Sequence, residues 1–146
     1  MSLRYEYLIV PATCWLLAQG VKYALTLRKD GIQLRDLYAS GGFPSSHTSF
    51  VTGLALIIGL RLGFDSVEFS LGASFAAVVM YDALAVRRTT GQQTAAINEL
   101  ASNTKNKLKS KMGGAKGHTP LEVIGGLVLG VLVALTVYAV DVNYVR

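Results

Sequence analysis

Apolar residues in this chain fall into four blocks, separated by polar segments and each near the length that crosses a bilayer. The blocks are about 7–27, 48–63, 66–86 and 121–140. A helix rises about 1.5 Å per residue, so about 20 residues cross a hydrocarbon core of roughly 30 Å. The pattern therefore predicts an all-α, polytopic integral membrane protein. We expect a single domain over 1–146 with about four transmembrane helices.

The segment 87–117, between the third and fourth blocks, is polar and basic. It opens with Arg87 and Arg88, and residues 92–111 are good helix formers with scattered apolar positions. This composition is typical of a basic surface helix or an ordered cytoplasmic loop. Gly113 and Gly114 would end it before the last transmembrane helix begins.

The distribution of Lys and Arg predicts the orientation. Most of these residues lie in segments 28–39 and 87–117, whereas the opposite side carries only Arg4, Arg61 and Arg146. The positive-inside rule then places both segments in the cytoplasm and both termini outside. We expect a multi-pass protein of the cell (inner) membrane.

Composition narrows the class further. A hydrophobic fraction of 51% with only 16% charged residues is unusual for a soluble domain. The net charge of +5 fits anionic lipid headgroups, and without interleaved aromatic and basic residues no nucleic-acid partner is expected.

A single cysteine, Cys14, allows neither an intrachain disulfide nor a cysteine metal site. We predict no signal or transit peptide at the N-terminus. Small-residue pairs such as Gly126 and Gly130 favour close helix packing, and make a homodimer reasonable.

The stretch 41–49, Gly-Gly-Phe-Pro-Ser-Ser-His-Thr-Ser, is a candidate anion site. Two glycines permit a tight entry, and Pro44 fits the first turn of a helix. Ser45 and Ser46 supply hydroxyls, while a helix start supplies unpaired N–H groups and the positive end of the dipole. His47 adds a proton donor or acceptor. The alternative is a polar helix cap that carries an interfacial histidine.

A second histidine lies in Gly117-His118-Thr119-Pro120-Leu121-Glu122. Thr119, Pro120 and Glu122 fit a capping box, which explains those three residues without any function. His118 is left unexplained. A carboxylate four residues later can also reach its ring and fix its tautomer, so Glu122 is either a cap alone or a partner of His118.

Both histidines start an apolar block from the same side of the membrane. Packed side by side, the two helices would bring His47 and His118 together with two positive dipole ends. Lys22 and Lys29 share a face if the first helix continues that far, and Arg87 emerges with Arg88 at the same level. Such a pocket suits a phosphate group at headgroup depth. One histidine could attack phosphorus while the other protonates the leaving oxygen.

Asp82 lies near the end of the third block and has two interpretations. It could be an interfacial acid paired with Arg87, Arg88 or Lys22. It could instead tune one of those cations or shuttle a proton, because an ionisable residue inside a membrane span often has a function.

These motifs resemble the divergent, compact branch of the type 2 phosphatidic acid phosphatase (PAP2) family, which is related to vanadium-dependent haloperoxidases. The branch pattern is present at 41–47, 81–88 and 117–123. The wider family has three motifs: first Lys, six residues, Arg-Pro; second Pro-Ser-Gly-His; third Ser-Arg, five residues, His, three residues, Asp. Here Ser46 replaces the glycine of the second motif, and Glu122 replaces the aspartate of the third. Lys29 replaces the arginine of the first motif. Met112 stands where the third motif has an arginine, so Arg87, Arg88, Lys111 or Lys116 would have to substitute.

The resemblance implies a role for each matching residue. His118 would be the nucleophile that forms a phosphohistidine, oriented by Glu122, and His47 the general acid. Phosphate oxygens would be held by cations and by the second motif: Lys22, Lys29, Ser45, Ser46 and one of Arg87 or Arg88. Fixed cations stabilise the charge in this scheme, so it requires no metal and no cofactor.

The expected function is a membrane phosphatase acting on a lipid phosphate or an isoprenoid (di)phosphate. The alternative is a non-catalytic membrane protein that binds anionic headgroups, or a small transporter component. Both readings keep the cationic pocket, and they differ in whether the bound phosphate group is turned over.

Overall fold

The computed structural model describes residues 5–27, 42–103 and 118–145, and every regular element in these ranges is helical. Two π-helical turns, η2 (Asp82–Val86) and η3 (Asp141–Val145), directly follow α-helices. The α-helices are α1 (Glu6–Leu27), α2 (Ser46–Leu62), α3 (Val67–Tyr81), α4 (Arg87–Asn103) and α5 (Pro120–Val140). The predicted all-α fold class is confirmed.

Three helices are long and apolar enough to cross a membrane: Glu6–Leu25, Val67–Ser102 and Pro120–Asn143. The remaining predicted crossing, the second apolar block, corresponds to α2, a shorter apolar helix of 17 residues. This helix packs against α1, α3 and α5, so it lies among the other helices of the bundle. The chain is a multi-pass membrane protein.

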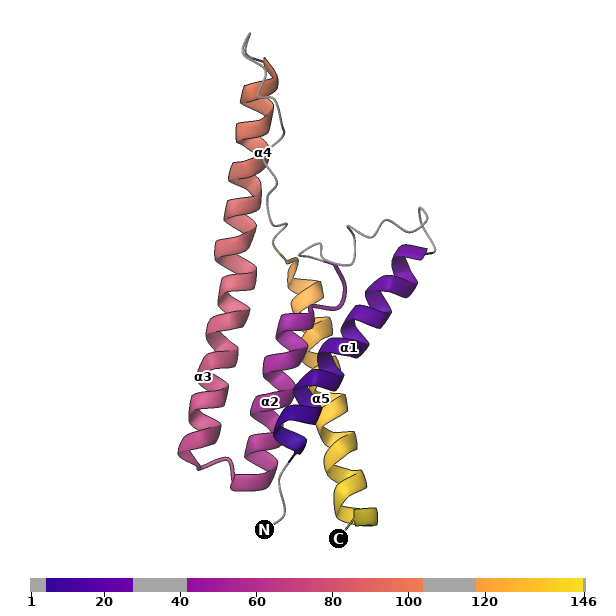
Figure 1. Cartoon of the computed structure of the whole chain (residues 1–146). Coiled ribbons are helices and arrows are strands. Elements are labelled where there is room, and N and C mark those ends of the chain that lie inside the picture. The colour runs from indigo at the N-terminus through magenta and orange to yellow at the C-terminus, as the bar shows by residue number, and fades with distance from the viewer. Residues whose placement is uncertain (1–4, 28–41, 104–117, 146) are drawn as a thin grey trace.

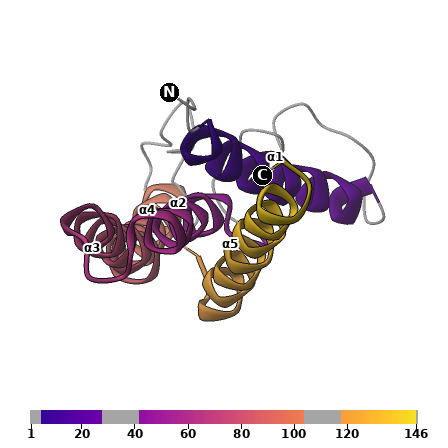
Figure 2. The same ribbon diagram turned by 90° about the horizontal axis from the view of Figure 1, so that it is seen from below.

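The helices are arranged around α2. Figure 2 shows α3 on one side of α2, and α1 with α5 on the other. In Figure 1 the starts of α2 and α5 lie at the end of the bundle towards which α1 runs. The start of α1 and the end of α5 lie at the opposite end. Both histidine motifs therefore reach the same end of the bundle.

One expectation about the start of the His47-bearing helix was wrong. Pro44 was expected in the first helical turn, but Ser45 is the cap residue and α2 begins at Ser46. Pro44 thus precedes the helix. The expected tight entry is present, because Gly42 has a φ of 91°, in the region that favours glycine.

The helices α3 and α4 form one continuous rod through η2 (Figure 1). The candidate span Val67–Ser102 has 36 residues, hence about 54 Å, which exceeds the roughly 30 Å hydrocarbon core. The rod therefore extends beyond the bilayer. The predicted basic segment begins as a direct continuation of the third helix. Its remainder, 104–117, lies outside the described residues.

The contact between α2 and α5 is made by glycines. A Cβ added at Gly130 would lie 2.7 Å from the Ser49 carbonyl oxygen and 3.0 Å from the Gly53 nitrogen. A Cβ added at Gly126 would lie 2.4 Å from the Ser45 carbonyl oxygen. Between helices in lipid, close van der Waals packing replaces the hydrophobic driving force. The predicted close-packing role of Gly126 and Gly130 is confirmed.

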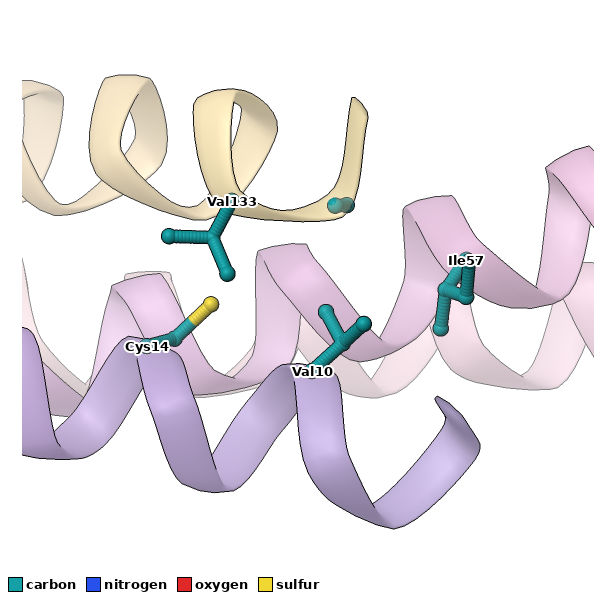
Figure 3. Close-up of a cluster of buried hydrophobic side chains, with 5 residues drawn as sticks. Val10, Cys14, Ile57 and Val133 are labelled. Carbon is teal, nitrogen blue, oxygen red and sulfur yellow. The ribbon is translucent and has the colours of Figure 1, made fainter. Parts of the chain in front are cut away.

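A small apolar core joins α1 to α2 and α5 (Figure 3). Val10 and Cys14 of α1 face Ile57 of α2 and Val133 of α5. Cys14 is buried and seated over Gly53, where an added Cβ would lie 2.6 Å from its sulfur. The single cysteine thus serves as a small packing residue.

The opposite end of the bundle is closed by Arg61 of α2, whose side chain is 4% exposed. Its Nε lies 2.8 Å from a carboxylate oxygen of Glu6, and it also pairs with Asp141. The guanidinium stacks 4.7 Å from the centre of the Tyr138 ring. One buried cation thus ties the start of α1 and the end of α5 to the end of α2.

Gly130→Ala is expected to destabilise the bundle by about 1–3 kcal/mol, because the added methyl meets backbone atoms that cannot rotate away. Thermal unfolding in detergent measures the loss. Gly20→Ala is the matched control, since nothing lies within 4 Å of a Cβ at Gly20. Equal unfolding temperatures for the two variants would contradict direct contact between α2 and α5.

Arg61→Met is expected to cost about 3 kcal/mol, because it leaves two largely buried carboxylates without their cation. The same unfolding assay measures the effect. Adding Glu6→Gln and Asp141→Asn to Arg61→Met should restore much of the lost stability, since no uncompensated charge is left. A triple variant less stable than Arg61→Met would show that the carboxylates do not depend on Arg61.

Candidate functional site

The start of α2 is fixed by Ser45, which is fully buried. Its Oγ caps the helix by accepting hydrogen bonds from the Thr48 nitrogen at 3.4 Å and the Thr48 hydroxyl at 3.0 Å. The Ser45 N–H donates to the Glu122 carbonyl oxygen at 2.9 Å. The second motif is therefore bonded to α5 through the backbone, so the two histidine-bearing helix starts are held in register.

The start of α5 carries the predicted capping box. Thr119 Oγ1 accepts from the Glu122 N–H, and Glu122 Oε2 accepts from the Thr119 N–H at 2.9 Å. The same Oε2 lies 3.0 Å from His118 Nδ1. Of the two interpretations of Glu122, cap alone or partner of the ring, the geometry supports a residue that does both.

His118 is held from a second direction by the π turn. Its N–H donates to the Ala83 carbonyl oxygen at 3.2 Å, and only 3% of the residue is exposed. Because Nδ1 faces Glu122, the ring's other nitrogen, Nε2, is the one left for chemistry. The contacts to η2 and Glu122 fix the position of the imidazole before any ligand arrives.

A cation from α1 approaches the start of α2. Lys22 Nζ donates to Ser46 Oγ at 3.1 Å, and a Cβ added at Gly42 would lie 3.9 Å from the Lys22 stem. The carboxylate of Glu122 also acts electrostatically on Lys22. Lys22 thus lies near both helix starts, where its ammonium adds to their positive dipole ends.

His47 is the exposed member of the histidine pair. The ionisable groups that act electrostatically on its ring are Arg87, His118, Lys22 and Asp82. Arg87 Nε in turn lies 2.8 Å from Asp82 Oδ2, with both side chains 40% exposed. His47 therefore lies near ionisable groups that three separate parts of the chain bring together: Lys22, the Asp82–Arg87 pair and His118.

The structure brings together most of the residues that the sequence singled out: Lys22, Ser45, Ser46, His47, Asp82, Arg87, His118 and Glu122. Among the side chains that the structure describes, Arg87 is an observed partner of Asp82. Lys29 lies outside the described residues, so its expected place on the face of Lys22 is not described. The backbone of Arg88 belongs to α4, but its side chain is outside the described part.

Two contributors to the site were not among the site residues predicted from the sequence. The Ala83 carbonyl holds the His118 backbone, and Gly126 allows the close approach of α5 to Ser45. Gly126 carried a signal, because it is one turn after Glu122 in a small-residue pair. Ala83 carried none, since an alanine in an apolar helix gives no sign that its carbonyl is used elsewhere.

The arrangement can bind an anion and transfer a proton. Two helix N-termini, a lysine and an arginine surround a buried imidazole with a carboxylate partner and an exposed second imidazole. Helix starts and cations favour a phosphate or another oxyanion. A histidine oriented by a carboxylate is typical of nucleophilic or general-base chemistry.

Two comparisons with known proteins match this chain. Residues 3–133 match the family described as the Divergent PAP2 family. The chain is also 34% identical to "Uncharacterized membrane protein YuiD" of Bacillus subtilis (strain 168), over 66% of this chain and 70% of that protein.

No solved structure shows a significant match to this chain. The family match spans both histidine motifs, the π turn and most of α5. The chain therefore belongs to the divergent PAP2 family of membrane proteins.

Proposed function

We propose that the chain is a membrane phosphatase that hydrolyses a lipid phosphate or an isoprenoid (di)phosphate through a phosphohistidine. The observation that carries the proposal is the convergence of the His118–Glu122 pair with His47, Lys22 and Arg87 at two helix starts. Family membership supports it. The site lies at the ends of membrane-spanning helices, where the headgroup of a lipid substrate would be found.

The first step forms a bond between His118 Nε2 and phosphorus while the bond from phosphorus to the lipid oxygen breaks. Glu122, 3.0 Å from Nδ1, holds the ring and stabilises the positive charge that develops on it. Protonated His47 donates its proton to the leaving alcohol. Water, deprotonated by neutral His47, then attacks phosphorus and releases His118 and phosphate.

Charge on the phosphoryl group is stabilised by fixed donors. Lys22 and Arg87 supply cations, and the Ser45 and Ser46 region supplies the start of α2. Lys29 and Arg88 remain further candidates for the same role. Preorganised donors of this kind commonly contribute the largest share of catalysis in transfer reactions of charged groups.

One observation favours the alternative, a protein that binds anionic headgroups without turnover. The Ser46 hydroxyl occupies the position of a glycine in the wider family and accepts a hydrogen bond from Lys22. A bound phosphate would have to compete for that lysine. Vanadate separates the two functions, because it adopts the geometry of the phosphoryl transition state and sulfate does not.

The first test is phosphate release by the purified protein in detergent without added metal. The panel is phosphatidic acid, phosphatidylglycerol phosphate and polyprenyl diphosphates. Wild type is expected to release phosphate from at least one substrate, and His118→Ala to lose all release. The exposed serine variant Ser70→Ala, at the other end of the bundle, should match wild type. Folded protein that releases nothing, or that vanadate and sulfate protect equally against unfolding, would support headgroup binding instead.

If His47 is the general acid, the rate loss in a His47 variant should depend on the leaving group of the substrate. His47→Ala should slow release from a lipid ester by about 10²–10⁴-fold, the usual contribution of a general acid. With p-nitrophenyl phosphate the loss should be much smaller in the first step, because that leaving group needs no proton. Equal losses with both substrates would argue against His47 as the acid.

The proposed orientation places the site at the cytoplasmic leaflet of the cell membrane. Ser102→Cys and Glu68→Cys introduce thiols at exposed positions near opposite ends of one rod. In intact cells an impermeant maleimide is expected to label the Glu68 variant and to leave the Ser102 variant unlabelled until the cells are opened. The reverse pattern would place the site outside.

A further inference from the structure

The rod through α3 and α4 contains a π turn at the level of the candidate site. The Arg87 N–H donates to the carbonyl oxygen of Asp82, five residues earlier, and this bond defines η2. Such turns are rare and are found frequently at functional sites. The two residues that close this π turn, Asp82 and Arg87, also form an ion pair.

The π turn makes that ion pair geometrically possible. In a regular α-helix, with 3.6 residues per turn, residues five apart point about 140° away from each other. The wider turn, closed by a bond across five residues, brings the same two residues nearly onto one face. Arg87 Nε and Asp82 Oδ2 can then approach to 2.8 Å.

The same turn contacts the buried histidine. Ala83, the second residue of η2, is 3% exposed, and its carbonyl accepts the His118 N–H. The Arg87–Asp82 pair is therefore fixed relative to His118 through three consecutive structural steps: ion pair, π turn and backbone hydrogen bond. Both charges of the pair also act electrostatically on the His47 ring, which places the pair near the site.

We propose that Asp82 is a positioning residue that holds the Arg87 guanidinium where it binds the substrate's phosphate group. The inference rests on the proposed phosphatase function and identifies Arg87 as the cation that serves in place of the arginine absent at Met112. Glu122 is the only other carboxylate described in the site, and it is bonded to His118 and Thr119.

The chemistry of the pair fits this role. Asp82 engages the guanidinium at Nε, and arginine carries four further N–H donors in the same plane. A planar guanidinium held along one edge presents its other donors in the fork that matches two phosphate oxygens. Lysine has no such second edge, so Arg87→Lys keeps the charge but removes the fork.

Positioning and charge tuning by Asp82 predict opposite results. If Asp82 only neutralises Arg87, removing its charge should strengthen the binding of an anion. If Asp82 positions Arg87, the same change should weaken binding, because the guanidinium loses its fixed orientation. The sign of the change in anion affinity therefore distinguishes the two roles.

The experiment is titration calorimetry of orthophosphate and vanadate into the purified full-length protein. Asp82→Asn is expected to weaken binding about three- to tenfold, and Arg87→Ala about tenfold or more, as for a lost charge-assisted hydrogen bond. Arg87→Lys should fall between wild type and Arg87→Ala. In the Arg87→Ala background, Asp82→Asn should have no further effect, because Asp82 acts through Arg87.

Controls separate positioning from stability. Glu99→Gln removes a carboxylate from the same rod away from the site and should leave affinity unchanged. The pair is 40% exposed, so the unfolding temperature of ligand-free Asp82→Asn should stay close to that of wild type. Tighter binding by Asp82→Asn, or additive effects in the double variant, would overturn the inference.

The outcomes also separate this inference from the proposed function. Wild type that binds phosphate but hydrolyses none of the panel would overturn the phosphatase, while the affinities still test Asp82 and Arg87. Wild type that binds neither orthophosphate nor vanadate would overturn both. A normal phosphatase whose affinity is insensitive to Arg87→Ala would overturn only the inference.

Discussion

Direct contact between the backbones of α2 and α5 is the constraint on which the other features depend. In lipid the hydrophobic effect does not drive helices together, so their association depends on close packing and hydrogen bonds. Gly126 and Gly130 allow that approach, and one turn before Gly126 the Ser45 N–H donates to the Glu122 carbonyl oxygen. The two histidine-bearing helix starts are thus held together by the same contact that holds the bundle. Any side chain larger than hydrogen at these glycines acts on stability and on the candidate site at once.

The arginines at the two ends of the bundle, Arg61 and Arg87, differ in how deeply they are buried. Arg61 is almost fully buried between carboxylates of two other helices, so replacing its partners would expose charge to a medium that cannot solvate it. Arg87 is paired with a single carboxylate, and both side chains remain 40% exposed. A half-exposed pair gains little from its own attraction and can accept an additional anion at low cost. Burial therefore separates a cation that ties helices together from one that is available to a ligand.

Local patterns allowed much of this structure to be predicted. The apolar blocks gave four helices, and the capping box at Thr119 was readable because its residues are adjacent in the chain. The nearness of His47 and His118 followed from two helix starts on one side of a membrane. The π turn could not be predicted, because residues 82–86 have the sequence of an ordinary apolar helix. The grouping of Glu6, Arg61 and Asp141 was also missed, since no local pattern connects residues so far apart.

The Arg61 cluster has a consequence for how the protein is made. Its cation is synthesised after Glu6 but 80 residues before Asp141. During membrane insertion Arg61 can therefore pair with the first helix while the last is still unmade. The closing contact of the bundle forms only when the end of α5 emerges from the ribosome. A chain truncated before Asp141 would therefore leave the Arg61 guanidinium with only one of these two carboxylate partners.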